Sequence, residues 1–178
     1  MSGVRGVAAA LASSRRRAET LAVRTVRMAP FSLLGGLVVG PVVGLLATLA
    51  MDRVMPRLPE GTTAPRVAAG VLTGVPVGDA PGRLATWVHY VAGGGSGILF
   101  VGLVAAARAV LGIGTPAAAV VAAPVMLALM VGFFALVPLP RAEGLPRQRL
   151  APIRRDWALA AAAYVVVAAV LIVAAAGV

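Results

Sequence analysis

Cysteine, lysine and asparagine are absent from this 178-residue chain, and histidine occurs once, as His89. Without cysteine there can be no disulfide, thiolate metal site or cysteine nucleophile. One histidine and six scattered acidic residues do not supply the three clustered ligands that a metal ion needs. Without lysine there is no Walker-type phosphate loop, and no dinucleotide-binding glycine pattern follows a predicted strand. We therefore expect no metal site and no cofactor.

Serine and histidine are also poorly placed for nucleophilic catalysis. His89 precedes Ser96 by seven residues, which is roughly 10 Å along the axis of one helix. At that separation the imidazole is too far away to take the hydroxyl proton. We therefore expect no catalytic residues, and the sequence predicts a protein that is not an enzyme.

Charge is missing from four long apolar runs, which cover residues 31–51, 87–107, 117–137 and 157–178. Each run has at least about 20 residues, the length that an α-helix needs to cross a ~30 Å hydrocarbon layer. The runs are continuously apolar rather than alternating, which disfavours a β-barrel. A chain that is 60% hydrophobic and 12% charged is also too apolar for a soluble domain. The sequence therefore predicts an all-α integral membrane four-helix bundle over residues 31–178. The lipid bilayer is then the expected surrounding of these helices.

A basic tail precedes the bundle at residues 1–30. Its arginines are Arg5, Arg15, Arg16, Arg17, Arg24 and Arg27. Apolar residues between them allow part of the tail to be an amphipathic helix lying on the headgroups. A disordered cationic tail is equally compatible with the composition, so both interpretations stay open.

Arginine and tryptophan border the apolar runs. Five arginines are expected to contact anionic lipid headgroups, and they are Arg15, Arg16, Arg17, Arg154 and Arg155. Trp87 and Trp157 open the second and fourth runs, which is typical of an aromatic belt at the membrane interface. Since the arginines lie beside membrane spans, the net charge of +10 needs no nucleic-acid partner.

Three connections join the runs. The longest covers residues 52–86, and within it residues 67–79 form a short apolar segment interrupted by Pro76. This segment is either a re-entrant or interfacial piece, or an ordered loop packed on the bundle, and we favour the loop. Residues 108–116 predict a tight antiparallel hairpin. Residues 138–156 are expected to be non-helical because they contain Pro138, Pro140, Pro146 and Pro152.

Glycine recurs every four residues in the first two runs. Gly36, Gly40 and Gly44 form the first row, and Gly93 and Gly97 form the second. Residues at i and i+4 share a helix face, and small residues let membrane helices approach closely. We therefore predict that these glycines form helix-packing faces.

The glycine rows end near two polar residues, Asp52 and His89. Consecutive spans run antiparallel, so both residues belong to the same membrane edge and come within hydrogen-bonding reach if the glycine faces meet. A carboxylate–imidazole pair could relay protons or sense pH. Alternatively, the two side chains join two helices, or each is solvated by headgroup water.

These features favour a non-enzymatic accessory or scaffold component of unknown specific function. In this hypothesis the small-residue faces pack on a second copy of the chain or on a larger membrane complex. The alternative is a small transporter or channel that uses the edge formed by Asp52 and His89 and the segment 67–79.

Four spans place both termini on the same side of the membrane. A small excess of arginine in the two long loops favours loops in the cytoplasm, but moving the basic tail across a membrane is unfavourable. We therefore expect cytoplasmic termini. The arginine-rich, lysine-free composition is typical of GC-rich prokaryotic genomes, so the expected location is a prokaryotic cell membrane, crossed several times.

Overall fold

Four long helices dominate the computed structural model, which describes residues 33–177. They are α2 (Leu33–Val54), α4 (Gly82–Leu111), α5 (Thr115–Leu136) and α6 (Arg147–Gly177). Each is long and apolar enough to cross a membrane, and no strand occurs within residues 33–177. The predicted all-helical chain with four candidate spans is therefore confirmed. The basic tail, with Arg15, Arg16 and Arg17, lies outside the described residues.

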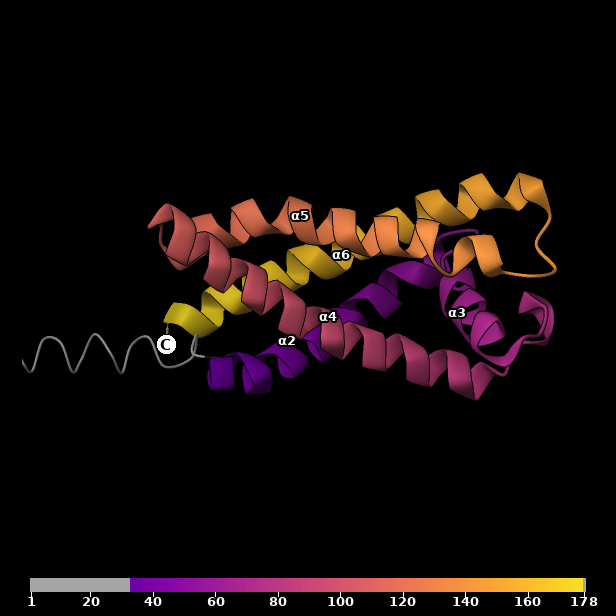
Figure 1. The fold of residues 1–178 in the computed structure, drawn as a ribbon, viewed down its shortest axis with the longest axis horizontal. Helices are drawn as coiled ribbons and strands as arrows, with labels where there is room; N and C mark the ends of the chain where they lie inside the picture. The colour runs from indigo at the N-terminus through magenta and orange to yellow at the C-terminus, as the bar shows by residue number, and fades with distance from the viewer. Residues whose placement is uncertain (1–32, 178) are drawn as a thin grey trace, which may run out of the picture.

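The four helices lie side by side along the long axis, and the chain reverses direction at each connection (Figure 1). Helix α2 packs against α4 and α6, and α5 packs against the same two helices. Helices α2 and α5 are therefore at opposite corners of the bundle. Helix α2 begins and α6 ends at the same end, while the long connections lie at the other end (Figure 1).

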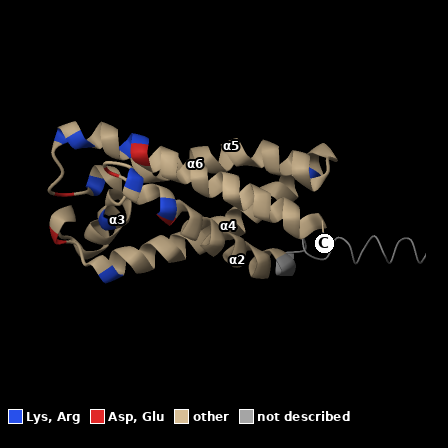
Figure 2. Ribbon diagram, turned by 180° about the vertical axis from the view of Figure 1, so that it is seen from behind, with Lys and Arg blue, Asp and Glu red and all other residues tan. Residues whose placement is uncertain are grey.

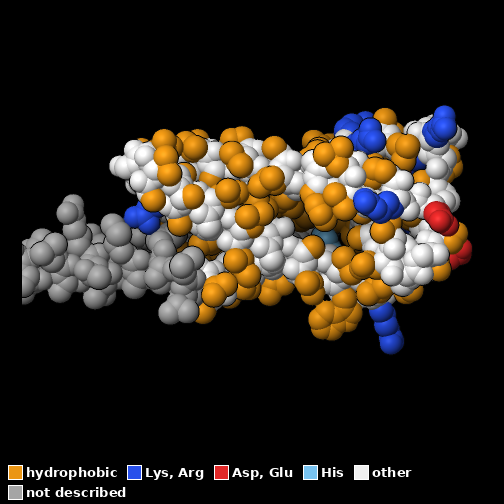
Figure 3. All heavy atoms as spheres, viewed as in Figure 1, with side chains coloured by type: hydrophobic (Ala, Val, Ile, Leu, Met, Phe, Trp, Pro, Cys, Tyr) orange, Lys and Arg blue, Asp and Glu red, His pale blue; other side chains and the backbone are white. Residues whose placement is uncertain are grey.

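The outside of the bundle is as apolar as its inside. Large apolar side chains such as Val38, Val120 and Phe133 are well exposed, while the core contains many alanines around Phe100 and Tyr164. Hydrophobic side chains are spread over the whole length of the face shown in Figure 3. Helices that are apolar all round occur in large cores or in membranes. The fold is therefore that of a multi-pass membrane protein by composition.

Glycine brings α2 and α4 into close contact. A Cβ atom on Gly40 would lie 2.6 Å from the Cα of Ile98, and one on Gly97 would lie 2.6 Å from the backbone nitrogen of Gly44. A Cβ on Gly93 would meet the hydroxyl of Thr48. The predicted glycine rows thus pack against each other within one chain. Gly36 is different, because a Cβ there would only touch Val101 at an ordinary 3.4 Å.

Helix α6 begins at Arg147, so the expectation of a non-helical segment up to residue 156 is wrong for residues 147–156. Pro152 lies inside this helix and removes one backbone hydrogen bond. The helix persists because Ile153 is fully buried and Leu150 packs beside it, in a cluster with Phe134. Tertiary packing therefore outweighs the local effect of the proline.

The segment between α2 and α4 is mostly helical. It contains η2 (Met55–Arg57), α3 (Thr63–Thr73) and η3 (Val77–Asp79), a helix flanked by two 3-10 turns. Helix α3 buries Val67 and Ala69, and exposes Arg66 and Leu72. It lies across the end of the bundle against α4 (Figure 1). Residues 67–79 therefore pack on the bundle, as a helix and a turn rather than as a loop.

The connection between α4 and α5 is as short as expected. Helix α4 ends at Leu111, Gly112 adopts a left-handed conformation (φ 64°), and α5 begins at Thr115. The two helices form an antiparallel hairpin at this end. Charged residues gather at the opposite end, around α3, and Arg108 is the exception among the described residues (Figure 2).

Candidate functional site

A cavity of about 200 Å³ lies inside the bundle near α3. We call it the crevice. Its lining comes from α2, α3, α4, α5 and α6, with Pro138 after α5. Figure 3 shows a hollow between α4 and α5, and the imidazole of the single histidine is visible at its bottom. The two helices are joined by the tight hairpin at one end, so the crevice lies where they diverge, beneath α3.

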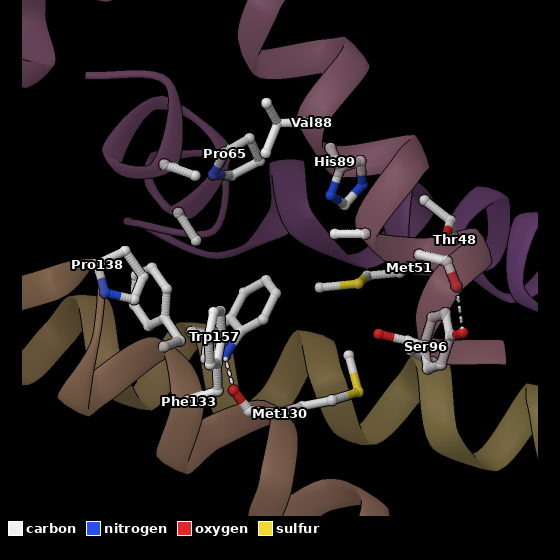
Figure 4. Close-up of a pocket in the computed structure, with 16 residues that line it drawn as sticks. Thr48, Met51, Pro65, Val88, His89, Ser96, Met130, Phe133, Pro138 and Trp157 are labelled. Atoms are coloured by element: carbon white, nitrogen blue, oxygen red, sulfur yellow. Dashed lines mark hydrogen bonds between the residues drawn. The ribbon is translucent and has the colours of Figure 1, made fainter. Parts of the chain in front are cut away.

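The crevice wall on the side of α5 and α6 is aromatic. Phe133, Phe134, Trp157 and Tyr164 contribute to it (Figure 4). The rings of Phe134 and Trp157 are 5.0 Å apart between centroids, and Trp157 Nε1 donates a hydrogen bond to the carbonyl of Met130 at 3.2 Å. Such a wall is suited to an apolar or aromatic guest.

The two tryptophans assigned to the membrane interface have different surroundings. Trp87 is 70% exposed on α4, as an interfacial residue would be. Trp157 is half-buried between α5 and α6 and bonds to the backbone of α5. Its start-of-run position in the sequence suggested an outer belt, but α6 already begins at Arg147, and Trp157 packs against Phe134 of α5.

Tyr164 closes the inner end of the crevice. Its side chain is fully buried, and its hydroxyl donates to the carbonyl of Gly93 at 2.6 Å. Tyr164 was not among the site residues predicted from the sequence. The available signal was that Tyr164 carries the only side-chain hydrogen-bonding group after Trp157 in the fourth run, and such a group needs a partner in an apolar environment.

The structure brings Asp52 and His89 together. Nε2 of His89 lies 2.8 Å from Oδ1 of Asp52, and the hydroxyl of Tyr90 donates to Oδ2 of the same carboxylate at 2.6 Å. The side chain of His89 is 10% exposed and that of Asp52 is 33% exposed. Tyr90 was not part of the predicted pair; it and His89 each contact a different oxygen of the same carboxylate.

A second, more polar cavity of about 490 Å³ is also lined by His89. We call it the polar cleft. Asp52, Arg66 and Tyr90 line it, together with residues of the loop before α3. His89 and Pro65 line both cavities. The apolar crevice and the polar cleft are therefore neighbours at these two residues.

A hydrogen-bond network holds the connection before α3 against the start of α6. The buried carboxylate of Asp156 accepts the backbone N–H of Glu60 at 2.8 Å and Nε of Arg155 at 2.9 Å. Arg149 donates two hydrogen bonds of 2.7 Å to the Glu60 carboxylate, and these lower the pKa of Glu60. This network positions α3 over the crevice. Arg154, by contrast, is exposed, as a headgroup contact would require.

No group of three histidine, cysteine or acidic side chains is arranged to hold a metal within residues 33–177. His89 bonds to Asp52 and not to Ser96. Comparison of the chain with protein-family models, with curated proteins and with solved structures finds no match.

Proposed function

We propose that this protein is a small, non-enzymatic transporter that takes up small apolar molecules from a membrane and exchanges them with the aqueous phase near α3. The observation that carries the proposal is that His89 and Pro65 line both the apolar crevice and the polar cleft, so the two cavities adjoin there. When an apolar molecule leaves a bilayer for water, its transfer free energy is unfavourable by about 25 cal/mol for each Å² of apolar surface that becomes exposed. An apolar cavity beside a polar cleft would divide this transfer into two smaller steps, first from lipid into the cavity and then from the cavity into water.

The size of the crevice limits the guest. An engineered cavity of about 150 Å³ in another protein stays dry and binds benzene. By that comparison, a crevice of about 200 Å³ accommodates a molecule with one or two fused rings. The crevice is smaller than the sites that hold drug-sized ligands, so we propose a compact guest.

The scaffold hypothesis receives less support from the geometry. It depended on glycine faces that are available to another chain. Gly40, Gly44 and Gly97 are instead in contact across the α2–α4 interface of one chain. A scaffold built on these faces would require α2 and α4 to separate, which is why we propose the transporter.

Filling the crevice is expected to abolish binding. Ala92 lines the crevice from α4, so Ala92→Phe places a ring where the guest would lie. We expect naphthalene binding to weaken at least about tenfold, since the guest loses most of its buried apolar area. In a Trp87→Phe background Trp157 is the only tryptophan, and quenching of its fluorescence in lipid nanodiscs measures occupancy.

Ala106→Phe is the matched control, because Ala106 is exposed on the same helix and lies outside the residues that line the crevice. This variant should bind naphthalene like the parent chain. Equal quenching of Trp157 in both variants, or none in the parent chain after correction for lipid partitioning, would refute the proposal.

We also propose that the protein lies in a prokaryotic cell membrane with both chain ends in the cytoplasm. Moving the arginines of the tail across a bilayer is energetically unfavourable, which favours this orientation. A fluorescent or enzymatic reporter fused after residue 178 is expected to report the cytoplasm. A periplasmic signal would reverse the proposed orientation and place α3 and the polar cleft inside the cell.

A further inference from the structure

We propose that the guest of the crevice is a neutral aromatic alcohol, such as a phenol or naphthol, whose hydroxyl donates a hydrogen bond to Nδ1 of His89. This inference rests on the proposed function, since it names the class of molecule that the same crevice takes. It is carried by the hydrogen bonds of Asp52, which determine the proton on the imidazole, and by the position of that ring in the crevice.

The Asp52 carboxylate fixes the tautomer of His89. One of its oxygens accepts from the Tyr90 hydroxyl at 2.6 Å, and the other lies 2.8 Å from Nε2 of His89. We take this carboxylate as ionised and the imidazole as neutral; because an ionised carboxylate only accepts hydrogen bonds, Nε2 then carries the proton. In the neutral imidazole the lone pair is then on Nδ1.

Nδ1 of His89 is available to a guest. The imidazole hangs from α4 into the crevice (Figure 4). Among residues 33–177 the only hydrogen bond of the ring is the one from Nε2. Nδ1 is therefore an acceptor without a donor, next to an apolar cavity, and a guest with a hydroxyl group satisfies it.

The other hydroxyl groups at the crevice are engaged or distant. Thr48 donates to the carbonyl of Gly44 at 2.8 Å, and Tyr164 donates to that of Gly93. Ser96 lies two helical turns from His89, roughly 10 Å along the axis of α4. A guest hydroxyl beside His89 therefore meets a nitrogen acceptor without competition from these groups.

Charged guests fit the crevice poorly. A carboxylate guest would bring a second negative charge close to Asp52 and into an apolar cavity. A cation would find both oxygens of Asp52 already accepting hydrogen bonds, and Asp52 lines the polar cleft rather than the crevice. A neutral molecule with an aromatic ring matches Phe133, Phe134 and Trp157 on the opposite wall.

The test compares 2-naphthol with 2-methoxynaphthalene, which has the same rings but cannot donate a hydrogen bond. The full-length chain with Trp87→Phe is placed in lipid nanodiscs, and quenching of Trp157 is measured after correction for the partitioning of each probe. We expect 2-naphthol to bind roughly three- to tenfold more tightly, the ratio that one net hydrogen bond provides. His89→Phe is expected to reduce this ratio to about one.

Asp52→Asn is a second variant that tests the same hydrogen bond in case the His89→Phe chain fails to fold. The amide can donate to Nε2, which moves the imidazole proton to Nδ1 and converts the acceptor into a donor. We expect the preference for 2-naphthol to fall while 2-methoxynaphthalene still binds. Ala106→Phe should keep the parent ratio, since Ala106 lies outside the lining of the crevice.

The outcomes separate this inference from the proposed function. If neither probe quenches Trp157 in the parent chain, both proposals are overturned. If both probes bind with equal affinity, only the hydroxyl inference is overturned. A preference that survives His89→Phe or Asp52→Asn, or that disappears in Ser96→Ala, would place the hydroxyl elsewhere and overturn the role of Nδ1.

Discussion

Gly97→Ala is expected to lower the free energy of unfolding by about 3 kcal/mol, the upper part of the range for overpacking in a tight core. The added Cβ would meet the carbonyl of Gly40 and lie 2.6 Å from the nitrogen and 2.7 Å from the Cα of Gly44. These are backbone atoms of α2, so no side chain can rotate away to make room. Helices α2 and α4 would have to separate, and their contact is the most extensive in the bundle.

Gly102→Ala is the matched control on the same helix. Gly102 is exposed, and a Cβ there would meet no atom within 4 Å. This variant should be as stable as the parent chain or more stable by up to about 1 kcal/mol, since alanine favours helix over glycine. Unfolding in a mild detergent, followed by circular dichroism, measures both. Equal midpoints for Gly97→Ala and Gly102→Ala would show that α2 and α4 do not depend on this contact.

Tyr164→Ala is expected to be the second severe change, with a loss of about 2–3 kcal/mol. Changes of a buried aromatic residue to alanine cost about 3–5 kcal/mol in water-soluble proteins. A lower value is expected here because helices in lipid gain little from hydrophobic transfer and depend on packing. The side chain is fully buried in the core of the bundle. Its removal therefore leaves a void that joins the crevice.

Tyr164→Phe separates packing from hydrogen bonding. It keeps the ring and loses only the hydrogen bond to Gly93, which is worth about 1 kcal/mol. A ligand that binds only the folded state raises the unfolding temperature. Naphthalene should therefore stabilise Tyr164→Ala more than the parent chain, because the void left by the tyrosine enlarges the crevice. Thermal unfolding with and without naphthalene measures this difference. If Tyr164→Phe is as unstable as Tyr164→Ala, the loss of stability does not come from the packing of the ring.

Several features of the fold and the site were accessible from the sequence because they depend on local composition. The length of an apolar run determines whether a helix can cross a membrane, and all four helices were predicted in number and approximate place. The spacing of Gly40 and Gly44 indicated a face that admits close contact. The chain reversal between spans placed Asp52 and His89 at one edge, where the structure shows them hydrogen-bonded.

Other features were not accessible because they depend on contacts between distant segments. Helix α6 begins at Arg147 despite Pro152, since Ile153 is buried against Phe134 and α3. Trp157 consequently packs against Phe134 of α5. Tyr90 joins Asp52 only because α2 and α4 meet in one particular register.

The sequence by itself determined the helical spans, their antiparallel order and the glycine faces, because backbone hydrogen bonding and run length act along a single segment. Only the tertiary structure decided the crevice, the polar cleft and the place of His89 and Pro65 in the lining of both. A cavity is what remains after side chains from five helices have packed. Its shape therefore depends on crossing positions that no single segment specifies.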